Sequence, residues 1–165
     1  MVPTDHQLLG VFRSFMQAGY AKSPPKTTVK ELPGSKLITF EQGDFLATDL
    51  YFTNPDSIFS NGTTMIYCER KPAWFMSYWG WYDKHDISFL KEALRKNYDE
   101  GIFMGGRGPH RFEKGSRVYI NEYHGGFGKF SGAERLEKAG DPDILLGKHE
   151  YFGGLLIDND EIPLG

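Results

Sequence analysis

The chain has 165 residues, of which 39% are hydrophobic and 15% aromatic, and this composition allows a buried core and argues against disorder. Its net charge of -3 gives no support to general nucleic-acid binding, which needs a basic surface. We therefore expect a single folded domain over residues 1–165 that does not bind nucleic acid directly.

The single cysteine, Cys68, excludes an intramolecular disulfide and a cysteine-rich metal site. Because it lies inside an apolar stretch, we expect a buried thiol. The first residues are polar and predict no signal peptide, and no apolar run approaches the roughly 20 residues that a membrane span needs. These features predict a cytoplasmic protein without membrane association.

Residues 4–19 predict a helix whose N-cap is Thr4 or Asp5. Its apolar positions recur at helical spacing: Leu8, Leu9, Phe12, Phe15 and Met16. Residues 20–34 contain three prolines and predict an extended connector, because proline lacks an amide donor and fixes φ.

Residues 36–42 and 45–52 predict two strands, joined by a tight turn at Gly43-Asp44 and followed by a loop over residues 53–61. Residues 64–82 predict a β-hairpin that turns at Arg70-Lys71. With that turn, one side of the sheet carries Thr64, Ile66, Cys68, Ala73, Phe75 and Ser77, and the other carries Met65, Tyr67, Trp74, Met76 and Tyr78. A sheet with two apolar sides is either covered on both sides or lines a cavity.

A second helix is predicted over residues 83–97, with its apolar face at Phe89, Leu90, Ala93 and Leu94. A glycine-rich irregular segment follows over residues 101–115, and then a strand over residues 116–123. Residues 129–138 and 144–157 predict a second hairpin around residues 139–142. Residues 158–165 are expected to form a solvated tail.

Residues 59–83 and 130–154 share a pattern that indicates an internal repeat. Both open with Phe-Ser and continue through a strand, a turn that contains proline and a second strand. Both end in tyrosine, another aromatic residue and glycine, at residues 78–80 and 151–153. The sequence therefore predicts an α+β fold: a curved antiparallel sheet of about six to eight strands, built from two related β-meanders and packed against two helices.

An ordered series of short motifs resembles a family of bacterial domains of unknown function, over about residues 37–157. The motifs are Gly43-Asp44-Phe45-Leu46, Phe89-Leu90-Lys91-Glu92-Ala93-Leu94, Arg107-Gly108-Pro109, Phe130-Ser131-Gly132-Ala133-Glu134 and Tyr151-Phe152-Gly153-Gly154. Members of that family occur alone or behind a helix-turn-helix domain of the Xre/Cro type, which implies a sensing or accessory role. The resemblance implies no reaction, cofactor or catalytic residue.

This chain departs from the family in two ways. It has no helix-turn-helix of its own, because one helix and a proline-rich connector do not supply a recognition helix. It also has Phe152-Gly153-Gly154 where the family tends to end in His-Gly-Gly, so no role of that histidine carries over to this chain.

The loop over residues 105–111, GGRGPHR, is the best candidate for an anion site. Glycines let backbone amides approach a ligand, and Arg107 can grip a carboxylate or phosphate with two parallel bonds. The alternative is a flexible loop in which Arg107 pairs with a carboxylate of the protein. The spacing matches neither a P-loop nor a dinucleotide fingerprint.

Five histidines lack the spacing of a zinc site, so we expect no metal and no cofactor. His124 and His149 lie in corresponding meanders, where they could approach each other. Two strand acids that converge in a cleft could act as acid and base, although such acids more often face solvent. The candidates are Asp44, Asp49, Glu122, Glu134, Glu137 and Glu150.

The densest feature is a set of aromatic residues on the predicted sheet, which could line a site for a flat or apolar ligand or could belong to the core. The predicted ligand-binding residues are Tyr51, Tyr78, Trp79, Trp81, Arg107, Glu122, His124 and Tyr151. The leading hypothesis is a non-enzymatic module that binds a small or anionic ligand, or a regulatory accessory. The alternatives are a protein-interaction domain and an acid–base enzyme of the hydrolase or isomerase type, and a homodimer stays open.

Overall fold

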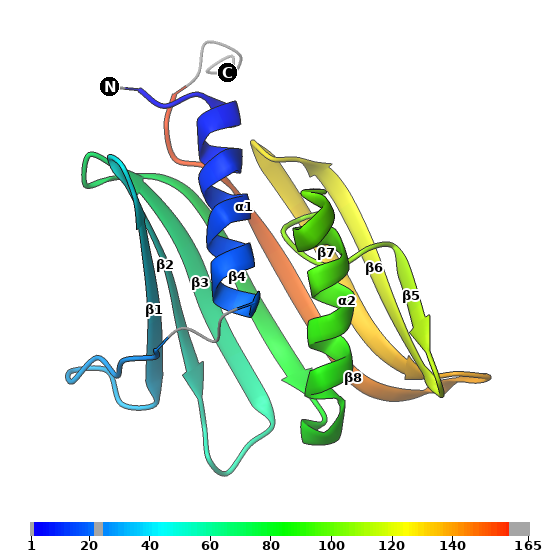
Figure 1. Ribbon diagram of the computed structural model, residues 1–165. Helices are drawn as coiled ribbons and strands as arrows, with labels where there is room; N and C mark the ends of the chain where they lie inside the picture. The colour runs from blue at the N-terminus through cyan, green and yellow to red at the C-terminus, as the bar shows by residue number, and fades with distance from the viewer. Residues whose placement is uncertain (1, 22–24, 159–165) are drawn as a thin grey trace.

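The computed structural model describes residues 2–21 and 25–158. In chain order it contains α1 (Asp5–Ala21), β1 (Ser35–Gln42), β2 (Phe45–Thr53), β3 (Phe59–Cys68), β4 (Lys71–Tyr82), the short 3-10 helix η1 (Lys84–Asp86), α2 (Ile87–Glu100), β5 (Arg111–Lys114), β6 (Arg117–Gly126), β7 (Lys129–Lys138) and β8 (Asp141–Leu155). The eight strands form one antiparallel sheet, and both helices lie on the same face of it (Figure 1). The predicted α+β fold is confirmed.

The sheet consists of two four-stranded meanders joined edge to edge, in the order β1-β2-β3-β4-β8-β7-β6-β5. Each meander follows its own helix in the chain. At the join, β4 pairs with β8 and sets Tyr78 opposite Tyr151 and Gly80 opposite His149. The centre of the sheet is therefore a seam between the two halves. The hairpins β3–β4 and β7–β8 occupy equivalent places in the strand order, and a sequence repeat between them stays a prediction.

The first helix begins with a capping box. The Thr4 hydroxyl accepts a bond from the Gln7 amide at 3.3 Å, and the Gln7 side chain accepts one from the Thr4 amide at 2.9 Å. The predicted helical face is buried at Leu8, Phe12, Phe15 and Met16. After the helix, the chain joins the sheet edge through an isolated bridge between Thr27 and Leu37. The rest of the predicted connector includes residues 22–24, which lie outside the described residues.

The sequence pattern predicts the wrong faces of the sheet for the side chains of β4. The turn falls at Glu69 and Arg70, which both have positive φ, instead of at Arg70-Lys71. A register shift beyond Pro72 then inserts one extra residue, so that Trp74 lies opposite Ile66. Because side chains alternate between the two faces of a sheet, one inserted residue moves every later side chain of β4 to the other face. Consequently the helix-covered face carries Thr64, Ile66 and Cys68 together with Trp74, Met76 and Tyr78.

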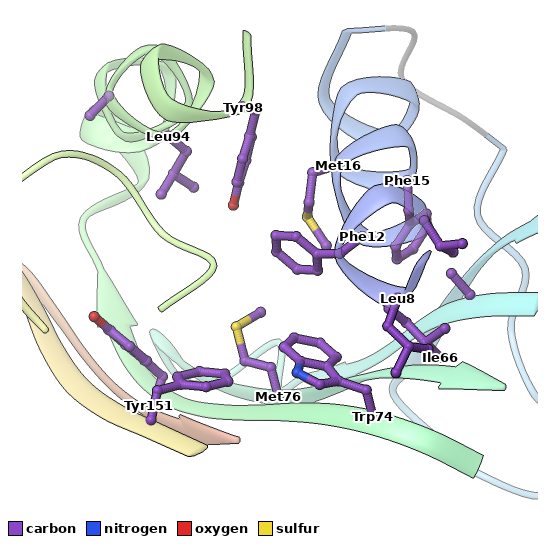
Figure 2. Packing of buried hydrophobic residues seen from close by; sticks show 14 of the residues in the cluster. Leu8, Phe12, Phe15, Met16, Ile66, Trp74, Met76, Leu94, Tyr98 and Tyr151 are labelled. Atoms are coloured by element: carbon purple, nitrogen blue, oxygen red, sulfur yellow. The ribbon is translucent and has the colours of Figure 1, made fainter. Parts of the chain in front are cut away.

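The core lies between this face and the two helices, and Trp74 is at its centre (Figure 2). The indole is fully buried and stacks on Phe127, with ring centroids 5.1 Å apart and an interplanar angle of 8°. Its Nε1 donates to the Phe127 carbonyl at 2.9 Å, and the ring of Phe12 on α1 packs against the indole with centroids 5.2 Å apart. One side chain thus ties α1 to β4 and to the turn between β6 and β7.

The structure also bears on the predictions for Cys68 and for membrane-spanning segments. Cys68 is buried, as predicted. Neither of the two helices that the structure describes has the length and apolar character needed to cross a bilayer. Residues 159–165 of the predicted tail lie outside the described residues.

Trp74→Ala should destabilise the fold by about 3–5 kcal/mol, because it removes a fully buried ring and leaves a cavity. Trp79→Ala is the matched control, since Trp79 lies on the same strand but is 56% exposed. Urea denaturation followed by circular dichroism measures both free energies of unfolding. Equal losses in the two variants would contradict this description of the core.

Candidate functional site

A cavity of about 440 Å³, here called the inner pocket, lies between the two helices and the first half of the sheet. Its walls are apolar where Phe15, Met16, Ile38, Met76 and Ile87 line it, and polar at Asp49, Thr64, Tyr78, Tyr82, Arg107 and His149. The exposed side chains of Lys26, Lys36 and Lys91 also line it and mark its mouth. The buried Thr64, Met76 and His149 form its inner end.

Asp49, on β2, is held by two donors from neighbouring strands. The Tyr78 hydroxyl donates to its two oxygens at 2.9 and 3.2 Å, and the Thr64 hydroxyl donates at 3.1 Å. Burial raises the pKa of the Asp49 carboxyl, and these hydrogen bonds oppose the rise. The Tyr78 ring crosses β3 at Gly62, where a Cβ atom would overlap the tyrosine hydroxyl. Glycine at residue 62 therefore permits the contact between Tyr78 and Asp49.

His149, on β8, has an unusual environment for a buried histidine. It is 4% exposed, and its ring lies against Tyr82 at a centroid distance of 4.3 Å and against Tyr78 at 5.8 Å. Neither ring nitrogen has a hydrogen-bond partner among the described residues. Burial, with the charge of Arg107, lowers the pKa of His149 to about 4, and Glu134 opposes the change. At neutral pH the imidazole is uncharged, and both of its nitrogens remain unsatisfied.

Behind His149 lies a buried ion pair between Arg107 and Glu134. The Arg107 Nε donates to Glu134 at 3.0 Å, and its Nη2 contacts the same oxygen. The hydroxyls of Tyr82 and Tyr119 also donate to this carboxylate. Burial alone would raise the pKa of Glu134, but the charge and hydrogen bonds of Arg107 outweigh it and lower the pKa. Burial and the nearby Glu134 raise the pKa of both tyrosines, which stay protonated donors.

The glycine-rich loop packs against the core. Gly106 has a φ of +73°, and a Cβ atom there would meet Met76 and Phe12 of the protein. The Tyr98 hydroxyl donates to the Gly106 carbonyl at 2.8 Å, and the Asn97 side chain donates to the Arg107 carbonyl at 3.0 Å. The predicted pairing of Arg107 with a carboxylate is confirmed. The glycines serve the close approach of the loop to α1, α2 and the sheet.

The sheet divides the predicted ligand-binding residues into two groups. Tyr51, Tyr78 and Arg107 line the inner pocket. A wider groove on the opposite side, here called the open-face groove, is lined by residues that include Tyr78, Trp79, Glu122, His124 and Tyr151. Trp79, Glu122 and His124 are exposed there, whereas the Tyr151 side chain is 2% exposed, lies in the core on the helix side (Figure 2) and donates its hydroxyl to Asn121. Trp81 lines neither of them. His124 is exposed in the groove and His149 is buried on the helix side, so the two histidines do not meet.

Several residues of the inner site were not among the predicted ligand-binding residues, and Asp49, Glu134 and His149 are the most important of them. For Glu134 the signal is the alternation of its strand. In β7, Phe130 and Leu136 are apolar at even positions, which predicts that Glu134 also faces the core. No comparable pattern marks Asp49, because β2 is half-buried along most of its length. Within residues 2–21 and 25–158, no group of three or more His, Cys, Asp or Glu residues is placed to hold a metal ion.

Comparison with known proteins identifies a family without identifying an activity. Residues 49–156 match the family model described as "Domain of unknown function (DUF5680)". No curated protein and no solved structure matches the chain. The matched part contains Asp49, Tyr78, Arg107, Glu134 and His149. The apolar wall from α1 and β1 precedes it, together with Lys36 on β1 and Lys26 in the connector.

Glu134→Gln should destabilise the fold by about 3–5 kcal/mol, because it leaves the charge of Arg107 buried without compensation. Glu150→Gln is the control, since it removes an exposed pair with Lys148 and should cost at most about 1 kcal/mol. Urea denaturation at pH 7 measures both. A Glu134→Gln variant within about 1 kcal/mol of the wild type would show that the pair is dispensable.

His149 should make the fold sensitive to acid. Its pKa is about 4 when folded and about 6.5 when unfolded, so the unfolded state binds the extra proton between these values. The stability that neutral His149 contributes is complete above pH 6.5 and is lost as the pH falls to 4. The loss is about 3 kcal/mol, taken as the pKa difference multiplied by 1.36 kcal/mol.

His149→Phe should remove this loss, since phenylalanine retains a ring and has no proton to bind. The quantity to compare is the free energy of unfolding of the variant minus that of the wild type, at pH 7 and at pH 4. His85→Phe is the control because His85 is exposed. An unchanged difference between the two pH values would contradict the assignment.

Proposed function

The chain belongs to the DUF5680 family, and we propose that it is a non-enzymatic module that binds one small organic molecule in the inner pocket. The observation that carries this proposal is His149, a buried side chain that lines the pocket and whose two ring nitrogens have no partner in residues 2–21 and 25–158. A buried polar group without a hydrogen-bond partner costs about 1–3 kcal/mol. A ligand that supplies the missing partner recovers that free energy.

The dimensions and walls of the pocket support the same proposal. Its volume of about 440 Å³ falls within the range of small-molecule sites, and its mixture of apolar walls and a few polar groups is typical of them. In this proposal Tyr51, Tyr78 and Arg107 belong to the ligand site. We propose that the domain has a regulatory accessory role in which the bound molecule acts as a signal.

An acid–base enzyme is the second candidate, and it is favoured by one observation. Asp49, whose pKa is raised, and His149, whose pKa is lowered, line the same pocket, which suits a carboxyl and an imidazole that exchange a proton with a substrate. Asp49 accepts hydrogen bonds from Tyr78 and Thr64, and these bonds suit a structural carboxylate as well as a catalytic one. We therefore rank the binding function ahead of the enzyme.

A protein-interaction domain, including a homodimer, would use the other side of the sheet. There Trp79 and Phe152 are each 56% exposed, and Trp79 stacks on the exposed Phe59 at 5.4 Å. Exposed aromatic residues of this kind are common in interfaces. This use of the open face is compatible with a ligand in the inner pocket, because the sheet separates the two sites.

Ile38→Trp should abolish ligand binding by filling the pocket from β1, because the larger ring occupies the ligand's space while tryptophan suits a strand. The wild type should gain thermal stability with those members of a metabolite panel that bind. A ligand at 100 times its Kd stabilises the fold by about 2.7 kcal/mol. Ile38→Trp should show none of these gains.

Thr39→Trp is the control, since the next residue on the strand points to the opposite face and is exposed. It should retain every stabilisation seen with the wild type. A panel that stabilises nothing, or that stabilises Ile38→Trp as much as Thr39→Trp, would contradict a ligand site in the inner pocket.

A further inference from the structure

The inner pocket is positively charged in a chain whose net charge is -3. Four basic residues line it, against the single acid Asp49. Glu134 neutralises Arg107, but none of Lys26, Lys36 and Lys91 forms an ion pair with another described residue. The pocket therefore attracts anions, although the chain as a whole does not.

The positive charge is concentrated at the mouth. The Nζ atoms of Lys26 and Lys36 lie over the same ring, that of Tyr51, at 5.4 and 5.8 Å from its centroid. The ring attracts both ammonium groups and keeps two like charges near each other. Lys26 and Arg107 also act on the Asp49 carboxyl, which compensates part of this charge deeper in the pocket. An anion at the mouth would relieve the remaining repulsion between the lysines.

The inner end of the pocket requires a ligand group that can donate and accept hydrogen bonds. His149 is neutral there, so one of its nitrogens donates a hydrogen bond and the other accepts one. A hydroxyl group can both donate and accept, and it carries no charge that burial would penalise. Between the two ends, Phe15, Ile38 and Met76 present apolar surface.

Resting on the proposed function of the pocket, we infer that its ligand is a small organic anion with an apolar body and a hydroxyl group at the end opposite its charge. The carboxylate or phosphate lies at the mouth beside Lys26 and Lys36. The apolar body lies against the wall that α1 and β1 provide. The hydroxyl group meets His149 at the inner end.

Three matched probes test this polarity on the wild-type protein by isothermal titration calorimetry. They are 3-(4-hydroxyphenyl)propionate, 3-phenylpropionate, which lacks the hydroxyl group, and tyramine, which replaces the anion with a cation. The hydroxylated acid should bind about fivefold more tightly than the acid without a hydroxyl group, as expected for one added hydrogen bond. Tyramine should bind more weakly than either acid, and the affinity of both acids should fall as salt is added.

Two variants assign the effects to residues. Lys36→Gln should weaken both acids about threefold and reduce the dependence of their affinity on salt, whereas Lys129→Gln, an exposed lysine outside the pocket, should change neither. His149→Phe should remove the preference for the hydroxylated acid. The probe comparison on the wild type stands without the variants, so it decides the question even if one of them fails to fold.

The outcomes separate this inference from the proposed function. Tyramine that binds as tightly as the acids, and loses its binding in Ile38→Trp, would leave the pocket as a ligand site and overturn its anion preference. Equal affinities in Lys36→Gln and Lys129→Gln would also overturn it. If none of the three probes binds at millimolar concentration, while other compounds stabilise the wild type but not Ile38→Trp, the ligand class is wrong and the pocket remains.

Discussion

The buried carboxylate of Glu134 is the interaction on which the second half of the structure depends. It accepts bonds from Arg107 in the glycine-rich loop, from Tyr82 at the end of β4 and from Tyr119 on β6. Burying one charge alone would cost several kcal/mol, so the guanidinium and the two hydroxyls have to be present together. The loop, the seam and β6 are consequently held in one arrangement by a single side chain.

The same ion pair determines the electrostatics of the inner pocket. Burial lowers the pKa of His149, and the charge of Arg107 lowers it further, so the imidazole stays neutral. Glu134 opposes this effect but is already committed to Arg107 and to two tyrosines. A buried neutral imidazole, to which no described side chain or backbone group is hydrogen-bonded, is then available at the inner end of the pocket. The ion pair thus helps to keep His149 neutral, and none of the residues that the structure describes uses its ring nitrogens.

Much of the fold could be predicted from the sequence, because helical and strand periodicities depend on local patterns. The buried faces of both helices and the strand that Glu134 shares with Phe130 and Leu136 are readable in this way. The faces of β4 were not, because a turn at Glu69-Arg70 and one inserted residue reverse the alternation. The predicted ligand-binding set also joined Tyr78 and Trp79, although neighbouring residues of one strand point to opposite faces of the sheet.

The inner pocket needs both halves of the chain. Asp49, Thr64 and Tyr78 come from the first meander, whereas His149 comes from β8 and Arg107 from the loop that follows α2. Only the pairing of β4 with β8, which sets Gly80 opposite His149, brings these groups together. A Cβ atom at residue 80 would overlap His149 and the neighbouring Lys148 carbonyl, so glycine is required for that approach.

The residues of the inner end lie within the part of the chain that matches the family, whereas Lys26, Lys36 and Ile38 precede it. The polar inner end thus belongs to the matched domain, as does Lys91 at the mouth, whereas Lys26 and Lys36 come from the connector and the edge strand in front of it.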